Sequence, residues 1–456
     1  MRKFIWILLI MFVFAGCKGQ EPEAGMGVVI DVVQEPDTDI EKLPEGLLDI
    51  AFYESSPAFG DFILLTSNGK AGLADKDGAI VVPAGEYKAV EVRKPFILGA
   101  RDGDIDFMNT NGRKLNVASV YGISYFYEGK AFALVEEKYY WLNETGSLER
   151  VEFEGAPCFL EKYNAIDYAG NEYALSRNGY IAYIDIPEGG AETAELQLMS
   201  FDGRQIPIPL AITVRPDDDY QIGSHNDLIY LRAQELFGAI DGYGNTVIPF
   251  EYDELKPAGE AGFIAKKAGK YGVIGNNGEV LLPCELIGIK EVKEELVVFE
   301  TNDLKKNGVM NLQGEVILYP EYELIYVGEG RIVGRKDFSN RFVYAKNGLE
   351  LSFGSFPPDG AFSNGLVSVM NENMKRGFAG FDGNVIVACE YDEVNTFQNG
   401  YAKVKKGELW GIVDMKGNVV VECKYDKIHG NGSFGFLLKM GNEWYYKSIQ
   451  NREEPK

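Results

Sequence analysis

Residues 401–428, YAKVKKGELWGIVDMKGNVVVECKYDKI, contain the pattern that decides the fold. The segment 414–417 (DMKG) is typical of a tight turn, because an Asp at its first position accepts backbone N–H groups two residues on. Gly417 suits the positive φ that closes a three-residue hairpin loop. The apolar, β-branched run 419–421 (VVV) predicts a strand covered on both faces. The whole stretch therefore predicts three strands joined by two tight turns.

The same pattern recurs through most of the chain. Equivalent turn glycines occur at Gly78, Gly112, Gly146, Gly179, Gly203, Gly244, Gly278, Gly314, Gly348, Gly383 and Gly417, and most spacings are 33–36 residues. A second glycine, six residues earlier, occurs at Gly72, Gly238, Gly272, Gly308, Gly377 and Gly411. Asp, Asn or Ser stands three residues before the turn glycine in most units. A fixed period of this length indicates a stacked array or a ring.

Four units end in a Tyr followed by an acid: Tyr252-Asp253, Tyr322-Glu323, Tyr391-Asp392 and Tyr425-Asp426. In any array these acids line up as a stripe. We interpret each acid as a cap of its own turn.

This pattern resembles the WG-repeat family, also called KWG repeats, which is known mostly from bacterial proteins of unknown function. The resemblance covers roughly residues 60–449, and the dipeptide that names the family is intact at Trp410-Gly411. Elsewhere another aromatic residue substitutes, or the aromatic residue is lost, as at Asn307-Gly308 and Arg376-Gly377. The resemblance implies no catalytic residues.

The pattern predicts an all-β protein of tandem hairpin repeats of about 34 residues, with helix nearly absent after residue 16. We expect a propeller-like array, either as one ring or as two rings of five or six blades. The alternative is an open β-solenoid or superhelix. Residues 186–234 break the rhythm and are the best candidate for a boundary between two halves.

The first residues predict a targeting signal. Arg2-Lys3 precede an apolar run from Phe4 to Phe14, and Ala15-Gly16-Cys17 follows as a small-small-Cys cleavage site. This segment resembles a bacterial lipoprotein signal, which implies cleavage after residue 16 and lipidation of Cys17. The alternatives are a plain secretory peptide or a membrane anchor, although the apolar run is shorter than the roughly 20 residues of a spanning helix.

We divide the chain into a signal peptide (1–16), a tether and linker (17–46), irregular repeats (47–215), regular repeats (216–449) and a tail (450–456).

Residues 432–447 look like a last unit that stops before its DxxG turn. The apolar run 27–33 (GVVIDVV) resembles the missing strand. It either completes the last unit and closes a ring without free edges, or pairs with the first unit as a cap.

The net charge of the chain limits the kinds of partner that it can bind. The formal net charge is −24, and it becomes −26 once residues 1–16 are removed. Such an acidic protein repels nucleic acid and anionic lipid headgroups, so we expect membrane contact through the N-terminal lipid only.

Cys284, Cys389 and Cys423 occupy equivalent places, six residues after a turn glycine. We interpret them as small buried side chains; a Cys389–Cys423 disulfide is the alternative.

Reaction centres are weakly indicated. The chain has two histidines, His225 and His429, and no GxSxG, HExxH or phosphate-loop motif. The acids of 102–106 resemble a calcium loop, but Phe107 stands where that loop needs glycine. Residues 217–219 are a bare acidic run. We therefore expect no catalytic residues, no metal and no cofactor.

The sequence favours a lipid-anchored, non-catalytic binding scaffold of the cell envelope, facing the outer membrane or the cell surface, with a protein or glycan partner. The alternative is a glycan-acting enzyme on a propeller-like fold, with acids in 186–234. A third hypothesis is a structural envelope component.

Overall fold

The computed structural model describes residues 40–449, except for 44–48, 53–61, 76–78, 94, 102–103, 118–119, 137, 154–155, 160–174, 187–193, 215–220, 302–305, 431 and 433–434. The signal segment, Cys17, residues 27–33 and the tail lie outside these residues, as does Gly78. Residues 39–456 form one compact unit. Its described part contains no α-helix, only strands and the short 3-10 turns η2 (Leu175–Asn178) and η3 (Gly259–Ala261), as the sequence predicted.

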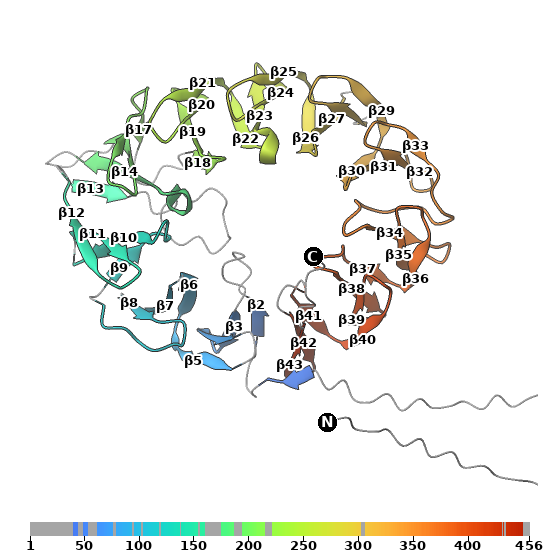
Figure 1. Cartoon of the computed structure of the whole chain (residues 1–456), viewed down its shortest axis with the longest axis horizontal. Helices are drawn as coiled ribbons and strands as arrows, with labels where there is room; N and C mark the ends of the chain where they lie inside the picture. Colours follow the sequence, from blue (N-terminus) through green and yellow to red (C-terminus); the bar gives the residue numbers. More distant parts are fainter. Residues whose placement is uncertain are drawn as a thin grey trace, which may run out of the picture. The chain divides into compact units, whose positions relative to one another are not determined.

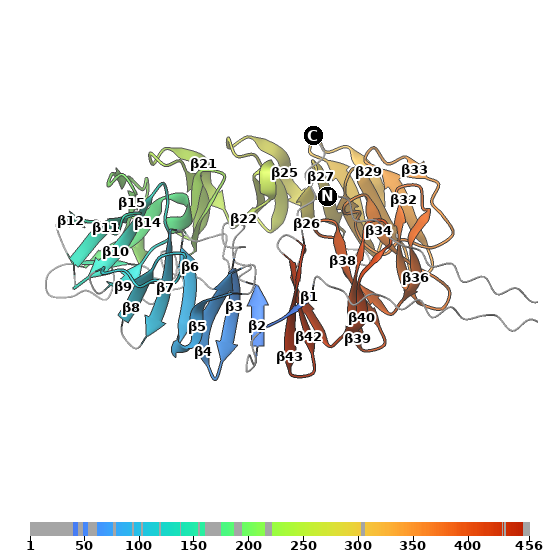
Figure 2. The same ribbon diagram turned by 60° about the horizontal axis from the view of Figure 1, so that its bottom comes forward.

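Within this unit the described strands form eleven small antiparallel repeat units, because the one seven-stranded sheet contains two consecutive units. They follow one another around a ring (Figure 1), so the all-β, propeller-like prediction is confirmed. The first strand of a complete unit is innermost and the fourth is outermost. The strands run along the depth of the ring (Figure 2).

The strand bounds follow by unit. Units 1 to 3 are β2 (Asp49–Phe52), β3 (Phe62–Ser67), β4 (Lys70–Asp75) and β5 (Ile80–Tyr87); β6 (Ala89–Arg93), β7 (Phe96–Arg101) and β8 (Asp104–Met108); and β9 (Val120–Ile123), β10 (Lys130–Val135), β11 (Lys138–Asn143) and β12 (Leu148–Val151). Units 4 and 5 are β13 (Ala156–Phe159), β14 (Tyr180–Ile186), β15 (Ala194–Ser200) and β16 (Gln205–Ile206), with β17 (Thr213–Val214) beside β15; and β18 (Ile222–His225), β19 (Leu228–Ala233), β20 (Leu236–Ile240) and β21 (Thr246–Tyr252).

Units 6 to 8 are β22 (Glu254–Pro257), β23 (Phe263–Lys267), β24 (Lys270–Ile274) and β25 (Val280–Leu286); β26 (Gly288–Lys293), β27 (Leu296–Glu300), β28 (Asn307–Asn311) and β29 (Val316–Tyr322); and β30 (Leu324–Gly328), β31 (Arg331–Arg335), β32 (Arg341–Ala345) and β33 (Glu350–Leu351). Units 9 to 11 are β34 (Leu366–Met370), β35 (Arg376–Gly380) and β36 (Val385–Tyr391); β37 (Glu393–Val394), β38 (Tyr401–Lys406), β39 (Leu409–Asp414) and β40 (Val419–Tyr425); and β41 (Lys427–His429), β42 (Gly435–Met440) and β43 (Glu443–Ser448), joined by β1 (Ile40–Lys42).

The DxxG segments form the turns between third and fourth strands. Asp414 Oδ1 accepts the backbone N–H groups of Lys416 and Asn418, each at 2.9 Å, and Gly417 has φ +84°. The predicted turn chemistry is therefore confirmed here. Gly417 also touches the preceding unit, since a Cβ on it would lie 2.5 Å from the carbonyl oxygen of Ile386. We call the side of the ring that carries these turns the DxxG end, and the side of the turns between second and third strands the second-turn end.

Gly179 does not belong to this series, so the prediction for this residue was wrong. It follows the 3-10 turn η2, donates its N–H to Ser176 O at 3.4 Å, and precedes β14. The DxxG turn of unit 4 is at Gly203, between β15 and β16. The local sequence 175–178 therefore closes a helical turn rather than a hairpin.

The earlier motif glycine lies on the third strand, against a bulge in the fourth. Trp410 pairs with Tyr425 and Ile412 with Val421, so the fourth strand carries extra residues opposite Gly411. A Cβ on Gly411 would lie 2.6 Å from Val421 O and 2.8 Å from the backbone nitrogen of Cys423. The same crowding by the fourth strand occurs at Gly72, Gly238, Gly272, Gly308 and Gly377. This position is glycine because the bulged strand occupies the space of a side chain.

The ring closes through a strand from the segment that we expected to be linker. β1 (Ile40–Lys42) pairs antiparallel with β43, in the place that the fourth strand takes in other units. Leu43 follows it, and its N–H donates to Trp444 O at 2.9 Å. The side chain of Leu43 packs in one cluster with Ile63 of unit 1 and Trp444 of unit 11. The last unit therefore lacks its own fourth strand, as the sequence indicated, and residues 40–42 supply it.

The rhythm break at 186–234 does not separate two rings. β14 of unit 4 and β19 of unit 5 share one hydrophobic cluster, which contains Ile184, Leu198, Ile229 and Leu231, all fully buried. Strands β15 to β19 lie within the irregular segment. The array is therefore continuous through this region.

We expect Gly411→Ala to lower the midpoint of thermal unfolding, since the new Cβ would overlap two backbone atoms of the bulge and cost about 1–3 kcal/mol. Gly85→Ala is the control, because Gly85 is exposed and a Cβ there meets nothing within 4 Å. Scanning calorimetry compares the two variants. Equal midpoints would contradict the steric account of the motif glycine.

We expect Leu43→Asp to open the ring at β1, because Leu43 is 7% exposed and a buried unpaired carboxylate is costly. Limited proteolysis should cut the variant near residues 40–43 faster than the wild type, and the unfolding midpoint should fall. Ile80→Asp serves as control, since Ile80 is 43% exposed at an outer edge. Cleavage of Leu43→Asp no faster than that of the control would show that closure does not depend on this contact.

Candidate functional site

The repeated acids hold neighbouring units together. The Oδ2 atoms of Asp392 and Asp426 accept the N–H groups of Gly407 and Gly441 at 2.8 and 2.7 Å, and Asp253 accepts that of Gly269 at 3.3 Å. Each glycine lies in a turn of the following unit, so the interpretation that each acid caps its own turn was wrong. Glu323 differs, lying 3.6 Å from Lys306 Nζ.

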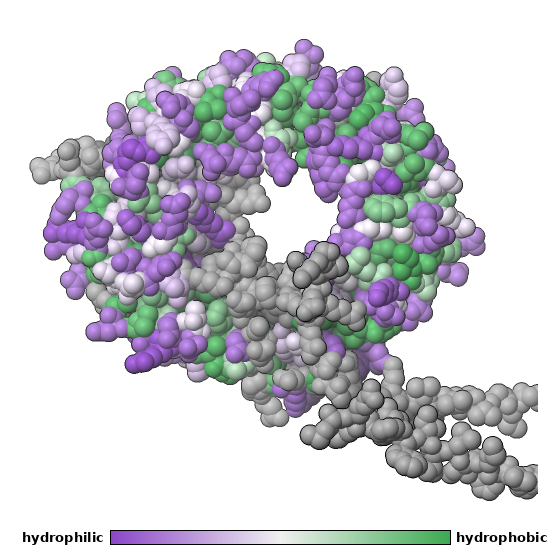
Figure 3. Space-filling view, in the orientation of Figure 1, coloured by the Kyte–Doolittle hydropathy of each residue, from purple (hydrophilic) through white to green (hydrophobic). Residues whose placement is uncertain are grey.

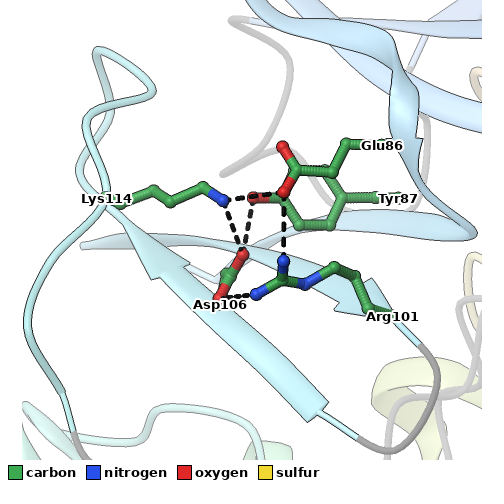
Figure 4. Close-up of polar contacts among 5 residues, drawn as sticks. All are labelled: Glu86, Tyr87, Arg101, Asp106 and Lys114. Atoms are coloured by element: carbon green, nitrogen blue, oxygen red, sulfur yellow. Dashed lines mark hydrogen bonds and ion pairs between the residues drawn. The ribbon is translucent and has the colours of Figure 1, made fainter.

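A group of two acids, two bases and a tyrosine in the irregular half joins units 1 and 2 (Figure 4). Asp106 accepts the Tyr87 hydroxyl at 2.8 Å and pairs with Arg101 at 2.6 Å and Lys114 at 3.0 Å. Glu86 pairs with the same two bases, at 3.1 and 2.8 Å. Burial raises the pKa of Asp106, but hydrogen bonds from Lys114 and Tyr87 outweigh it, so this pKa lies below its ordinary value. The negative charges of the two acids are neutralised by the positive charges of the two bases. This arrangement suits a contact between units and does not suit a carboxyl group that donates a proton.

The histidines, which the sequence analysis did not expect to be catalytic, lie in different units. The His225 ring lies in unit 5, with Nε2 2.8 Å from Gly259 O, while His429 stacks on Trp444 in unit 11. Residues 102 and 217–219 lie outside the described residues. Among the residues that the structure describes, no group of three His, Cys, Asp or Glu side chains is placed to hold a metal ion.

The three equivalent cysteines are free thiols. Cys284, Cys389 and Cys423 are partly buried, and their Sγ atoms lie 3.6–4.0 Å from carbonyl oxygens of the second strand. Burial raises the pKa of each thiol. These cysteines act as small packing residues, and the structure does not form the Cys389–Cys423 disulfide.

Figure 3 shows hydrophilic side chains around the visible part of the central opening. The innermost strands β22 and β26 carry the exposed lysines Lys256, Lys290 and Lys293. Lys256 pairs with Glu254 at 2.5 Å, and Lys290 pairs with Glu300. Two of these three lysines are therefore neutralised by acids of their own unit.

The family's aromatic position belongs to a row of side chains across the sheet, near the second-turn end. In unit 10 the register places Glu393 opposite Lys405 and Lys405 opposite Trp410. Lys405 Nζ lies 3.1 Å from Glu393 and 5.5 Å from the centroid of the Trp410 ring. Unit 6 repeats this row as Glu254, Lys266 and Tyr271, with the amine 5.2 Å from the ring centroid. A base on the second strand thus faces an aromatic ring on the third.

Units 8 and 9 replace that aromatic residue with arginine, at Arg341 and Arg376. Arg341 Nη1 lies 3.1 Å from Asp359 Oδ1, and Arg376 Nη1 lies 2.6 Å from Asp359 Oδ2, so one carboxylate serves two guanidinium groups. Arg335, directly opposite Arg341, has no ion-pair partner among the described residues. We call Arg335, Arg341, Arg376 and Asp359 the arginine rim. Phe338, 64% exposed, lies beside it, with the Arg341 guanidinium 5.6 Å from its ring centroid.

The sequence reasoning missed most of this group. It recorded that Arg376 stands at an aromatic position, but not that Arg341 does, because unit 8 has Phe342 where the motif has glycine. Counting seven residues back from Gly348 would have found Arg341. No sequence pattern identifies Asp359, since it lies in the irregular segment before β34 and belongs to no motif.

A second unpredicted group is a buried ion pair on the first strand of unit 2. Arg93 Nε lies 2.9 Å from Glu91 Oε1, and the two residues are 1% and 5% exposed. Burial raises the pKa of Glu91. Arg93 also stacks on the Tyr125 ring at 4.4 Å, and Arg177 stacks on it at 4.2 Å. These contacts join β6 to the segment after β9 and to η2.

Comparisons with known proteins agree with the repeat geometry. The profile of the WG containing repeat matches residues 237–271, 308–331, 377–410 and 410–434. A search of curated proteins finds no match. No helix in the described part of the chain meets the length and hydropathy of a membrane span.

Solved structures with low similarity also match. A eukaryotic initiation factor shares 8% identity at a TM-score of 0.35, covering 84% of this chain and 92% of that one. BamB from Moraxella catarrhalis shares 12% at 0.25, covering 80% and 93%. PorZ, a surface component of the type-IX secretion system of Porphyromonas gingivalis, shares 9% at 0.23, covering 85% of this chain and 61% of that one.

The four profile matches begin at or beside the aromatic position of units 5, 7, 9 and 10, in which the motif glycine faces the fourth strand as described above. Four segments in the C-terminal part of this chain therefore match the WG containing repeat.

Proposed function

We propose that this protein is a non-catalytic binding scaffold of the cell envelope, held to a membrane by a lipid on Cys17, and that its partner is a protein or a glycan. The observation that carries the proposal is the row near the second-turn end. Units 5, 6, 8 and 10 present a base at one equivalent place on the second strand, where units 7 and 9 have Glu300 and Met370. The residue opposite this base varies from the aromatic Phe237, Tyr271 and Trp410 to Arg341. Variation on a constant frame is the way in which repeat proteins build recognition surfaces.

The electrostatics of two acids at the contacts between units suit a structural role for these two residues. Glycoside hydrolysis needs one carboxyl group that keeps its proton at working pH, so its pKa must be raised. Asp106 and Asp392 have lowered pKa values, the first through the balance of burial and hydrogen bonds described above and the second mainly through its hydrogen bond from Lys375. These acids serve contacts between units.

The lipid anchor rests on the sequence of residues 2–17. Twenty-two residues separate Cys17 from Ile40, where β1 begins. Fully extended, that stretch spans at most about 80 Å. A tether of this length would hold the ring near a membrane while leaving its surfaces accessible. Because β1 closes the ring, the tether would enter the repeat unit at the closing strand.

Cys17→Ser should remove the protein from the membrane fraction, because a serine cannot take the acyl chains that would hold it there. Cys423→Ser is the matched control, since Cys423 is a free, partly buried thiol far along the chain. Fractionation of cells followed by immunoblotting measures the distribution. Membrane sedimentation of Cys17→Ser at the wild-type level would refute lipid anchoring at this residue.

A photo-crosslinking amino acid at Phe338 should capture a partner in intact cells, because Phe338 is 64% exposed beside the arginine rim. The same amino acid at Tyr243, 70% exposed in the DxxG turn of unit 5, is the control. We expect a discrete crosslinked species from position 338 and none from 243. Crosslinks from 243 alone, or from neither position, would contradict binding at the second-turn end.

A further inference from the structure

Unit 10 shows which neighbours can compensate a basic side chain at the second-strand position of the row. Lys405 has the Glu393 carboxylate on one side and the Trp410 ring on the other. The hydrogen bond to Glu393 raises the pKa of Lys405. The charge is therefore compensated by an acid on the first strand, and the ring covers its remaining side.

Unit 8 keeps the base but has lost both neighbours. The register places Leu324 opposite Arg335 on the first strand, and Arg341 opposite it on the third. Like charges directly opposite one another destabilise an antiparallel pair. Arg341 is compensated by Asp359, and its side chain is 3% exposed. Arg335 has no such compensation.

The nearby acids are already engaged. Asp359 binds both Arg341 and Arg376, and Glu321 pairs with Lys336 at 2.5 Å. Asp337 accepts two backbone N–H groups of its own turn, each at 2.9 Å. The Nε atoms of Arg335 and Arg341 are buried and have no hydrogen-bond partner among the described residues. Of the three arginines of the rim, Arg341 and Arg376 thus share one carboxylate and Arg335 has none, in a protein whose net charge is −24.

We propose that Arg335 is an oxyanion-binding site, which takes a carboxylate or phosphate group of the partner in the place that Glu393 takes beside Lys405. A guanidinium group binds such planar or tetrahedral oxyanions through paired N–H donors. Leu324, 37% exposed, and Phe338 flank the arginine rim, so the ligand would carry an apolar group next to its anionic one. This inference rests on the proposed binding function and gives it a ligand chemistry.

The test measures the unfolding midpoint of the full chain in detergent as sodium phosphate or sodium acetate replaces sodium chloride at constant ionic strength. A ligand that binds only the folded state raises this midpoint in a saturable way. We expect a saturable rise with at least one of the two anions. The anion that acts at the lower concentration distinguishes a phosphate ligand from a carboxylate ligand.

Two variants locate the effect. Arg335→Gln should raise the apparent dissociation constant at least about tenfold, equivalent to about 1.4 kcal/mol. Arg232→Gln should respond as the wild type does. It removes the same charge at the same repeat position in unit 5, where Arg232 lies opposite Phe237 and pairs with Glu235.

Leu324→Glu supplies the acid that unit 10 has and unit 8 lacks. We expect this variant to have a higher midpoint in chloride and to lose its response to the anions. The proposal is overturned if the wild type shows no saturable rise with either anion, if Arg335→Gln responds as the wild type does, or if Leu324→Glu leaves the response unchanged. Because the assay needs no partner, a negative result here and a failed crosslink at Phe338 are separate outcomes.

Discussion

The close contact between the third and fourth strands of each unit is the constraint on which this structure depends. Where the motif has glycine, the backbone of the bulged fourth strand fills the space of a side chain, as Val421 and Cys423 do against Gly411. The bulge turns the end of the fourth strand, so that Tyr425 is buried and packs with Phe436 and Leu438 of unit 11. One missing Cβ thus determines how a unit meets its neighbour.

Contacts between neighbours repeat around the ring. Tyr322 of unit 7 lies against Gly334 of unit 8, where a Cβ would be 2.6 Å from the ring, and Tyr87 meets Gly99 in the same way. At the DxxG end, both carboxylate oxygens of Glu294 accept the N–H groups of Glu329 and Gly330, one unit further on. Units 1 and 7 therefore bury a tyrosine against the next unit, and unit 7 also satisfies a backbone turn of unit 8. The last unit has no successor of its own, and β1 with Leu43 completes the ring against unit 1.

The residues that we propose for binding lie where the sequence of a unit departs from the repeat pattern. The repeated acids Asp392 and Asp426 and the acid Asp106 form contacts between neighbouring units. Arg335, Arg341 and Arg376 break the alternation of base and ring that units 6 and 10 show. They concentrate positive charge on an acidic protein, and positive charge with an exposed Phe338 is a combination that suits recognition of an anionic partner.

The sequence by itself determined the DxxG turns and the repeat period, because these depend on local rules: positive φ at Gly417 and side-chain capping by Asp414. It predicted the strand at 419–421, but the prediction that this strand is covered on both faces was wrong, since Val419 is 58% exposed on the outermost strand of its unit. It also indicated that the last unit lacks a strand. Only the tertiary structure decided that Ile40–Lys42 fills that place, that Gly179 ends a 3-10 turn, and that Asp392 and Asp426 cap turns of the next unit. Each of these outcomes depends on which segments the ring brings together, and the same is true of Asp359, whose neighbours Arg341 and Arg376 lie 18 and 17 residues away on different strands.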